Sequence, residues 1–359
     1  MRILSTIMEL NPPHNGHKYF LNEINKKKKK DDILIVVLSS CIVQRGEFSV
    51  INPIAKTKFL LNNNVDLIIE LPAVFANQGG FYFAKSAIEI LHLLNVDEIF
   101  FGSETNNLEE LKNYSFNFQN NKFNQGIYNN LNLKSNDILG ISYLAHLKTI
   151  KPNLIKRINN NYNDNFQNTS NIQSATYIRN NLNDPKINNF LDEYLINSIQ
   201  MIEYNLLFPT FLINLNYILN NDIKIFLSEN NEILYKFKKI INKYKVNNFD
   251  DLILYAKDKN NSQYKIKRII LNTIFIIEEK KIINYKINQI RILGFNDKGK
   301  LYIKNNKEKI NFITSLKNNN DYIYEKEIII KNIYNLLSKN EIDYNFGKPI
   351  ILGENYEQI

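Results

Sequence analysis

Residues 3–17 read ILSTIMELNPPHNGH, an apolar run followed by a loop of Asn, Pro, His and Gly. The run predicts a short β-strand, and the stretch after the loop, which ends in the lysines of residues 26–30, predicts a helix. His14 and His17 are three positions apart, so they share one face of the first helical turn. Gly16 between them removes side-chain bulk and lets a ligand approach the backbone.

This arrangement predicts an anion-binding site. The free N–H groups of a helix N-terminus attract anions, and two imidazoles beside them strengthen the attraction. Nucleotidyl transfer needs such donors, because negative charge grows on the triphosphate as pyrophosphate leaves. By itself, an H-x-x-H pattern fits a coincidence or part of a metal site equally well. Its place directly after the first strand favours the nucleotide interpretation.

Strand and helix patterns alternate along the first 180 residues. Continuous apolar runs predict buried parallel strands, and the segments between them have apolar residues at helical spacing. This order predicts an α/β fold with a Rossmann-like parallel sheet covered by helices on both faces. The expected strands are 3–8, 33–38, 67–71, 98–101 and 154–157, and the expected helices include 52–63 with Pro53 in its first turn, 81–94, and 137–148 with Ser135 as N-cap.

The pattern changes in the second half of the chain. Stretches of Ile, Leu, Tyr and Lys with few Gly or Pro follow from about residue 190, and helical periods dominate to about residue 285. Residues 291–295 (RILGF) precede a tail with some strand character. We therefore expect a Rossmann-like domain at 1–185 and a mostly α-helical domain at 186–359. Residues 105–134 are expected to form a loop with a short helix, and residues 158–171 a mobile loop.

The composition is that of a water-soluble globular protein, with 44% hydrophobic and 23% charged residues among 359. The chain has no run of 18 apolar residues, and its first residues lack the apolar core of a signal peptide, so neither a membrane nor secretion is expected. The single cysteine, Cys41, excludes an internal disulfide and a cysteine-built zinc site. No metal ligands are assigned. These features predict a cytoplasmic protein.

The formal net charge of +9 is spread along the chain, with +4 in residues 1–180 and +5 in residues 181–359. This charge permits an RNA partner through phosphate contacts, but a solvated lysine surface explains it equally well. Lysine vastly outnumbers arginine, so each arginine is the better candidate for a bidentate contact. The six arginines are Arg2, Arg45, Arg157, Arg179, Arg268 and Arg291.

A second candidate segment lies at residues 174–179, SATYIR. Ser174 and Thr176 precede Arg179 on an opening helix turn, where hydroxyls can cap the helix and bind phosphate. Arg179 is suited to clamp the β- and γ-phosphates of a nucleotide. Alone, the segment is better explained as an ordinary capped surface helix. Together with the loop at 14–17, it resembles the paired motifs of the HIGH-type nucleotidyltransferase superfamily. That resemblance implies ATP, attack on its α-phosphate to give an adenylate and pyrophosphate, and Mg²⁺ on the triphosphate.

A closer resemblance extends over a series of motifs in order along the chain. The motifs are similar to those of the tRNA(Met) cytidine acetate ligase family. They are E-x-N-P-x-H-N-G-H (9–17), V-Q-R-G-E (43–47), D-L-I-I-E-L-P (66–72), F-A-K-S-A (83–87), F-G-S-E (101–104), N-D-I-L-G (136–140), S-A-T-x-I-R (174–179) and R-I-L-G-F (291–295). A series of this length is far more specific than any one of its members.

The family resemblance implies a reaction and its partners. Acetate and ATP give acetyl-adenylate, and the acetyl group then passes to N4 of the wobble cytidine, position 34, of elongator tRNA(Met), which forms N4-acetylcytidine. The domain at 1–185 is then the ATP-binding catalytic domain, and the helical domain at 186–359 binds the tRNA. Nothing in the sequence indicates the oligomeric state.

The resemblance also implies site residues. His14 and His17 are the catalytic pair. The segment that wraps ATP consists of Ile7, Met8, Glu9, Leu10, Asn11, Pro12, Pro13, His14, Asn15, Gly16, His17, Lys18, Tyr19 and Phe20. The other nucleotide contacts are Gly102, whose missing side chain would admit the nucleotide, Asn136, Arg157, Ser174, Thr176 and Arg179. Arg45 is a possible substrate residue, which could hold acetate, hold tRNA, or form a loop salt bridge with Glu47.

The chain departs from the family pattern in two places. Leu10 and Pro13 stand where the family usually has aromatic residues, and residues 39–42 (SSCI) replace a small Gly-Asn element. Two other functions remain open. A small-metabolite adenylyltransferase would use the same ATP site, but would not explain residues 190–359. A degenerate tRNA-binding protein would have lost acyl transfer, which the intact histidine pair argues against.

Overall fold

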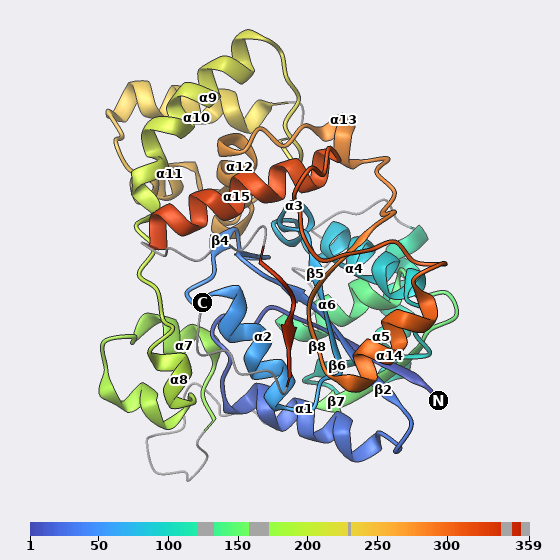
Figure 1. Ribbon diagram of the computed structural model, residues 1–359. Coiled ribbons are helices and arrows are strands. Elements are labelled where there is room, and N and C mark those ends of the chain that lie inside the picture. The colour runs from blue at the N-terminus through green and yellow to red at the C-terminus, as the bar shows by residue number, and fades with distance from the viewer. Residues whose placement is uncertain (121–132, 158–171, 229–230, 339–346, 353–359) are drawn as a thin grey trace.

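A mainly parallel sheet lies at the centre of the molecule (Figure 1). The computed structural model describes residues 1–120, 133–157, 172–228, 231–338 and 347–352. The strand order is β10-β8-β5-β2-β1-β6-β7, with β9 beside β8, and neighbours from β5 to β7 are parallel, as predicted. The strands are β1 (Ile3–Met8), β2 (Ile33–Ser39), β5 (Leu67–Leu71), β6 (Glu98–Ser103), β7 (Lys151–Lys156), β8 (Ile290–Phe295), β9 (Phe312–Ile313) and β10 (Ile350–Ile351).

Strand β2 explains why a continuous apolar run forms the middle of this sheet. It pairs with β1 on one side and β5 on the other, and all seven of its residues are buried. Successive side chains of a strand point to opposite faces. Leu34 and Val36 therefore enter one core, whereas Ile35 and Val37 enter the core on the other face. An apolar residue is needed at every position, because both faces are covered.

Helices cover both faces of the sheet, which confirms the predicted α/β fold. Leu21 and Phe59 pack in the core that contains Leu34, and Phe83 packs in the core that contains Ile35. The helices of the first half are α1 (Asn15–Lys27), α2 (Pro53–Asn62), α3 (Ala73–Ala76), α4 (Gly80–Leu93), α5 (Leu108–Asn120), α6 (Ser135–Leu144) and α7 (Ala175–Asn180). A separate antiparallel hairpin consists of β3 (Ile42–Val43) and β4 (Glu47–Phe48).

Three expected elements differ in the structure. Strand β7 begins at Lys151, whereas the sequence predicted a start at residue 154. Helix α5 spans 13 residues in a region predicted to be loop with a short helix. Helix α6 begins at Ser135 itself, so the predicted N-cap is wrong by one residue, and Lys134 has the extended backbone of the cap position. The reason is that a carboxylate from elsewhere satisfies this helix end, because Glu104 accepts the N–H of Asp137 (3.2 Å). The predicted mobile loop at 158–171 lies outside the described residues.

The last part of the chain extends the sheet. RILGF was expected to precede a tail with strand character, but it is itself part of β8, which pairs antiparallel with β5. Arg291 of this motif contacts Glu70 of D-L-I-I-E-L-P (3.1 Å), and Lys331 of α15 contacts the same carboxylate (2.6 Å). All three side chains are buried. The two motifs therefore meet in a buried ion-pair network that joins β5, β8 and α15.

The helices after residue 190 pack around aromatic side chains, and the helical character predicted for this region is confirmed. The ring of Phe211 lies 6.0 Å from that of Phe237 and 5.5 Å from that of Phe249, between centroids. In Figure 1, α9 to α12 gather at one end of the molecule, and α7 and α8 lie near the other. The elements are η2 (Pro185–Asn189), α8 (Glu193–Ile196), η3 (Tyr204–Leu207), α9 (Phe208–Asn220), α10 (Glu232–Tyr244), α11 (Phe249–Ala256), α12 (Gln263–Ile274), α13 (Glu279–Ile282), α14 (Asp297–Asn306) and α15 (Tyr322–Ser338).

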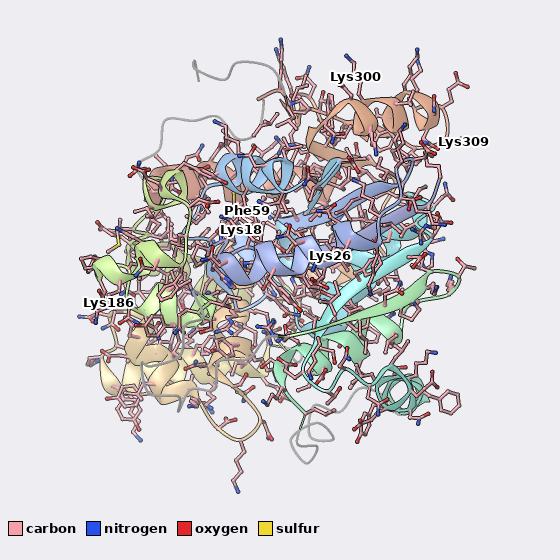
Figure 2. All side chains as sticks on the ribbon, turned by 90° about the horizontal axis from the view of Figure 1, so that it is seen from below. Lys18, Lys26, Phe59, Lys186, Lys300 and Lys309 are labelled. Atoms are coloured by element: carbon pink, nitrogen blue, oxygen red, sulfur yellow. The ribbon has the colours of Figure 1, made fainter. Side chains whose placement is uncertain are left out.

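Lysines are distributed widely over the surface. Figure 2 shows one face on which Lys18 and Lys26 lie along α1, Lys186 lies to one side, and Lys300 and Lys309 lie far to the other side. This distribution agrees with the even spread of net charge along the sequence. No helix in the described part of the chain combines the length and the apolar character needed to cross a membrane.

Candidate active site

The two loops that the sequence singles out lie where the strand order reverses. Strand β1 has β2 on one side and β6 on the other, and ligands of such sheets bind outside the carboxyl ends of the strands at this point. The loop that leads to α1 follows the carboxyl end of β1, and residues 104–107 follow the carboxyl end of β6. The histidine loop and Gly102, near the carboxyl end of β6, therefore share one edge of the sheet.

A buried lysine fixes the loop after β1. Nζ of Lys56, in α2, donates to the main-chain oxygens of Glu9 (2.8 Å), Ser39 (3.0 Å) and Ser40 (2.9 Å). Lys56 is fully buried, and this burial lowers the pKa of its ammonium to about 7. The lysine thereby joins the ends of β1 and β2, including the loop that departs from the family pattern. Sequence reasoning missed Lys56, because its partners are main-chain atoms that no motif reveals.

The apolar residues of segment 7–20 are largely core residues. Leu10 is 1% exposed and Pro13 is buried, so both departures from the family pattern lie inside the protein. Met8 is buried at the end of β1, and Tyr19 and Phe20 pack against the same core. These side chains support the loop from within.

The polar residues at the start of α1 hold the chain that follows α7. Nδ2 of Asn15 donates to the carbonyl of Asn189 (3.1 Å), and Lys18 forms an ion pair with Asp192. The main-chain N–H of Asn15 also donates to the carbonyl of Phe190 (3.0 Å). Segment 189–192 is therefore bound to the first turn of α1.

His14 and His17 form a reciprocal cap at the N-terminus of α1. Nδ1 of His14 accepts the N–H of Gly16 (3.0 Å), and Nδ1 of His17 accepts the N–H of His14 (3.2 Å). The two ring centroids are 3.9 Å apart. The sequence predicted that the rings share one face, and the structure brings them together in this way.

Both imidazoles are neutral. Burial and the charges of Arg157 and Arg179 lower the pKa of His14 to about 3. Burial, together with His14 and Arg157, lowers the pKa of His17 well below its usual value. A neutral imidazole whose Nδ1 accepts a hydrogen bond carries its proton on Nε2. Each ring therefore has one Nε2–H to donate, and the pair can stabilise phosphate oxygens without titrating near neutral pH.

Gly16 is required for a reason that the sequence did not reveal. A Cβ on this residue would lie 2.8 Å from Cε1 and 2.9 Å from Nδ1 of His14. The space that was expected to admit a ligand therefore holds the ring of His14, which folds back over the glycine. The glycine therefore makes room for the imidazole of His14.

Three predicted nucleotide residues meet at the end of β6. The stem of Arg157 lies over Gly102, where a Cβ would be 3.3 Å from Cγ of the arginine, so this side chain occupies the space expected to admit the nucleotide. Nδ2 of Asn136 donates to Glu104 (2.6 Å), and Nε of Arg157 lies 3.7 Å from the same carboxylate. Glu104 therefore organises the group, although the sequence identified it only as a member of F-G-S-E.

A buried aspartate shapes the loop beside this group. Asp137 accepts hydrogen bonds from the hydroxyl of Ser103 and from the N–H groups of Glu104 and Thr105, the last two at 3.1 Å each. Its side chain is fully buried. The motifs F-G-S-E and N-D-I-L-G therefore contact each other. The hydrogen bonds of Asp137 explain why the second motif contains an aspartate.

Helix α7 brings Arg179 to the loop after β1. Ser174 is the N-cap of α7 and accepts the N–H of Tyr177 (3.1 Å), as predicted. The guanidinium of Arg179 donates to the carbonyl of Asn11 and to the hydroxyl of Thr176 (3.3 Å). Residues 174–179 and the histidine loop, which are far apart in the sequence, are therefore in direct contact.

Arg45 does not form the loop salt bridge that the sequence allowed. Glu47 pairs instead with Lys267 of α12 (2.6 Å), and Nη1 of Arg45 lies 3.2 Å from the hydroxyl of Tyr264. The reason is the turn of the β3–β4 hairpin. Gly46 has a φ of +74°, which lets the turn pack closely against α12. Sequence reasoning missed Tyr264 entirely, since no motif contains it.

The hydrogen-bond donors of the site are either positively charged guanidiniums or uncharged groups. Within the ranges that the structure describes, no group of three or more His, Cys, Asp or Glu side chains could hold a metal ion. The predicted residues that come together are the histidine pair with Arg179 and Thr176, and Gly102 with Asn136 and Arg157. This arrangement can bind a polyanion and stabilise the charge that develops on it.

Sequence and structure comparisons identify related proteins. A sequence model of the HIGH Nucleotidyl Transferase family matches residues 1–133 and 115–348. A tRNA(Met) cytidine acetate ligase of Fusobacterium nucleatum is 31% identical over 97% of this chain and 98% of its own length. A protein of the same name from Thermosipho africanus is 30% identical over 98% of this chain and 100% of its own length.

Solved structures share the fold. A crystal structure of Thermotoga maritima TmcAL bound with alpha-thio ATP superposes with a TM-score of 0.78 and is 24% identical, covering 98% of this chain and 99% of that one. The apo structure of Thermotoga maritima TmcAL gives a TM-score of 0.81 at 24% identity, covering 98% of this chain and 100% of that one. The overall arrangement of sheet and helices is therefore common to both proteins.

Proposed function

We propose a function from the family of this chain, which belongs to the HIGH nucleotidyltransferases and, within them, to the tRNA(Met) cytidine acetate ligases. The proposed reaction is acetylation of the wobble cytidine of elongator tRNA(Met), driven by ATP. The observation that carries the proposal is the extent of the match. It covers 97% of this chain, and so includes the helical second half as well as the nucleotide loops. A small-metabolite adenylyltransferase would account only for the loops.

The reaction has two steps. An oxygen of acetate attacks the α-phosphorus of ATP, the bond to the β-phosphate oxygen breaks, and pyrophosphate leaves with acetyl-adenylate remaining. N4 of the cytidine then attacks the acetyl carbon, the bond from that carbon to the adenylate oxygen breaks, and AMP leaves. The N4 nitrogen loses one proton in this step. The Thermotoga maritima relative was crystallised with alpha-thio ATP, which supports ATP as the substrate of the first step.

The side chains at the sheet edge have distinct roles in the first step. The Nε2–H groups of His14 and His17 donate to phosphate oxygens as charge moves toward pyrophosphate, and the N-terminus of α1 adds its field. Arg179 contributes a fixed positive charge from α7. Asn136 and Arg157, held by Glu104, bind the nucleotide from the β6 side.

Mg²⁺ fits this site as an ion carried by the substrate. Mg²⁺ on nucleotides is commonly held by phosphate oxygens and water, with one or two carboxylates. Glu104 is a carboxylate at the β6 edge of the site, and its two oxygens already accept from Asn136 and from the N–H of Asp137, so phosphate oxygens and water would supply most of the ligands. When bound, the ion would neutralise charge on the triphosphate.

The two halves of the chain contribute different contacts in this proposal. Residues 1–185 supply the ATP-binding residues, and residues 186–359 bind the tRNA. The net charge of +5 in the second half supports contact with phosphates. A tRNA-modifying enzyme of this kind acts in the cytoplasm, where its ATP and tRNA are found.

The test is to incubate the protein with ATP, Mg²⁺, labelled acetate and unmodified elongator tRNA(Met), and then to digest the tRNA. We expect labelled N4-acetylcytidine at the wobble position, dependent on ATP and not supported by acetyl-CoA. Pyrophosphate release with another acceptor and no label in tRNA would instead establish a small-metabolite adenylyltransferase. Binding of tRNA without either signal would establish a degenerate binding protein.

A further inference from the structure

Two side chains from distant parts of the sequence lie side by side next to the candidate active site. The guanidinium carbon of Arg45 is 5.2 Å from the ring centroid of Tyr264, and its Nη1 is 3.2 Å from the tyrosine hydroxyl. Arg45 is at the tip of the β3–β4 hairpin, and Tyr264 is in the first turn of α12. Both side chains are partly exposed. Neither has a role in the adenylation step derived above.

The hairpin tip is rigidly held. A Cβ on Gly46 would lie 2.5 Å from the main-chain nitrogen of Arg268, so the two backbones are in close contact. Arg268 also donates from Nη1 to the carbonyl of Gln44 (3.1 Å), and the N–H of Gln44 donates to Glu9 in the loop after β1. The tip is therefore fixed on one side to α12 and on the other to the nucleotide loop.

No carboxylate among the described residues forms an ion pair with Arg45, although its charge acts on the buried carboxylate of Glu9. The nearest candidate in sequence, Glu47, is engaged with Lys267 (2.6 Å). A second guanidinium, that of Arg179, lies close enough that burial and the charge of Arg45 together lower its pKa. The carboxylates of Glu9 and Glu47 oppose this effect on Arg179 only in part, and the phosphate of a ligand near both guanidiniums would add to their effect.

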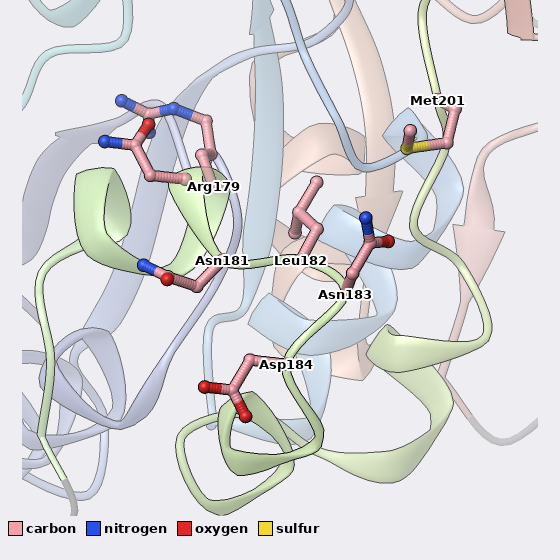
Figure 3. A pocket seen from close by; sticks show the side chains of 7 residues that line it. Arg179, Asn181, Leu182, Asn183, Asp184 and Met201 are labelled. Atoms are coloured by element: carbon pink, nitrogen blue, oxygen red, sulfur yellow. The ribbon is translucent and has the colours of Figure 1, made fainter.

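A cavity of about 460 Å³ opens beside Arg179 (Figure 3). Its wall consists of Arg179, the loop after α7 and Met201. Figure 3 shows Arg179 and Met201 on opposite sides, with Leu182 and Asn183 between them. The volume is within the range of small-ligand sites. Side-chain amides suit the hydrogen-bonding edge of a base, and the apolar Leu182 and Met201 suit its faces.

We propose that Arg45, Tyr264 and this cavity bind the anticodon loop of the tRNA. The reacting cytidine lies in the cavity, and a neighbouring nucleotide lies on the Arg45–Tyr264 pair. The inference rests on the proposed function, and it names the residues that serve its second substrate. Single-stranded loops are recognised by bases that leave the stack and rest on aromatic rings or guanidinium planes. Arg45 meets the phosphate, and Tyr264 meets the base.

The alternative ligand for Arg45 is the triphosphate of ATP, which has the same phosphate chemistry. Acetate-dependent exchange of labelled pyrophosphate into ATP measures the first step without RNA. Acetylation of tRNA measures both steps. A residue on the RNA side changes only the second assay, whereas a residue on the triphosphate changes both.

The variants are Arg45→Gln and Tyr264→Leu, with Tyr264→Phe as the conservative change. Tyr244→Leu is the matched control, because Tyr244 is likewise a surface tyrosine of a C-terminal helix with a cation over its ring, the ammonium of Lys243 (4.9 Å). For Arg45→Gln and Tyr264→Leu, we expect KM for tRNA to rise about tenfold or more, while pyrophosphate exchange stays within about twofold. Tyr264→Phe keeps the ring and should retain most of the tRNA affinity.

Three results would overturn the proposal. The first is a loss of pyrophosphate exchange equal to the loss of tRNA acetylation, which would place Arg45 on a substrate of the first step, ATP or acetate. The second is unchanged tRNA kinetics in both variants. The third is an equal effect of Tyr244→Leu. Failure of the proposed function itself would be visible earlier, since the unmodified protein would show neither acetate-dependent exchange nor labelled tRNA.

Discussion

Replacing His14 with asparagine separates its two functions. In the structure, Nδ1 of His14 caps α1 by accepting the N–H of Gly16 (3.0 Å), and we propose that its Nε2–H donates to the nucleotide. Asparagine is among the best N-cap residues, so His14→Asn keeps the cap. Its shorter side chain lacks a donor at the position of Nε2. His14→Ala removes both functions, and the two variants therefore form a matched pair.

The size of each effect follows from these contacts. Loss of one donor to the developing charge lowers the rate by about a hundredfold to a thousandfold, and this loss should be the same in both variants. Loss of the cap costs about 1 kcal/mol of stability, or a few degrees in melting temperature, and only His14→Ala should show it. ATP affinity should fall less than the rate, because the donors act mainly on the transition state.

The assays are acetate-dependent pyrophosphate exchange and thermal unfolding. Ionisation of His14 should not change the exchange rate between pH 6 and pH 8. Burial and the neighbouring arginines lower the pKa of His14 to about 3, so the ring stays neutral throughout this range. If the exchange rate of His14→Asn were within about threefold of that of the unmodified protein, His14 would act only as a helix cap. An acidic limb near pH 6.5 that disappears in His14→Asn would contradict the neutral-donor assignment.

Three further changes test the arrangement around the site. Gly16→Ala puts a Cβ 2.8 Å from Cε1 of His14 and displaces the ring, so exchange should fall about tenfold, while melting temperature should change little because the higher helix propensity of alanine, about 1 kcal/mol, offsets the weakened cap. Glu104→Gln weakens the charged contacts to Asn136 and Arg157 and should raise KM for ATP in the exchange assay about tenfold. Glu70→Gln breaks a fully buried ion pair and should cost about 3–5 kcal/mol in unfolding experiments, whereas Glu109→Gln, on an exposed pair, should cost less than about 0.5 kcal/mol. Burial raises the pKa of Glu70, but its cationic partners outweigh burial and hold it below its usual value. The stabilisation by Glu70 should therefore persist above about pH 4 and decline as the pH falls below that.

The parallel part of the fold was predictable because its signal is local. A run such as that of β2 is apolar at every position, and only a strand covered on both faces requires this pattern. The docking of β8 was not predictable in the same way. It depends on the contact between Glu70 and Arg291, which are 221 positions apart, and neither residue alone indicates the other. The sequence showed the two motifs but not that they meet.

The site residues were also predictable only where their signal is local. The histidine pair was predictable, because a spacing of three residues on a helix determines which side chains are neighbours. Lys56, Glu104 and Tyr264 were missed, because each acts through partners far away in the sequence. The packing of the His14 ring over Gly16 was missed for a related reason. Periodicity shows where a side chain is absent, but not which other side chain occupies the space.

Contacts across the site determine which experiments can separate its two steps. Arg268 of α12 holds Gln44, and Gln44 holds Glu9, so the helical half is connected to the nucleotide loop through two hydrogen bonds. The buried network around Glu70 connects α15 to the sheet as well. Removal of residues 190–359 would expose the sheet at β5 and release the loop at Glu9. Loss of tRNA binding by such a fragment would therefore not locate the RNA site. Point substitutions at Arg45 and Tyr264 leave these connections in place, and they are the changes that can assign RNA recognition to the hairpin and α12.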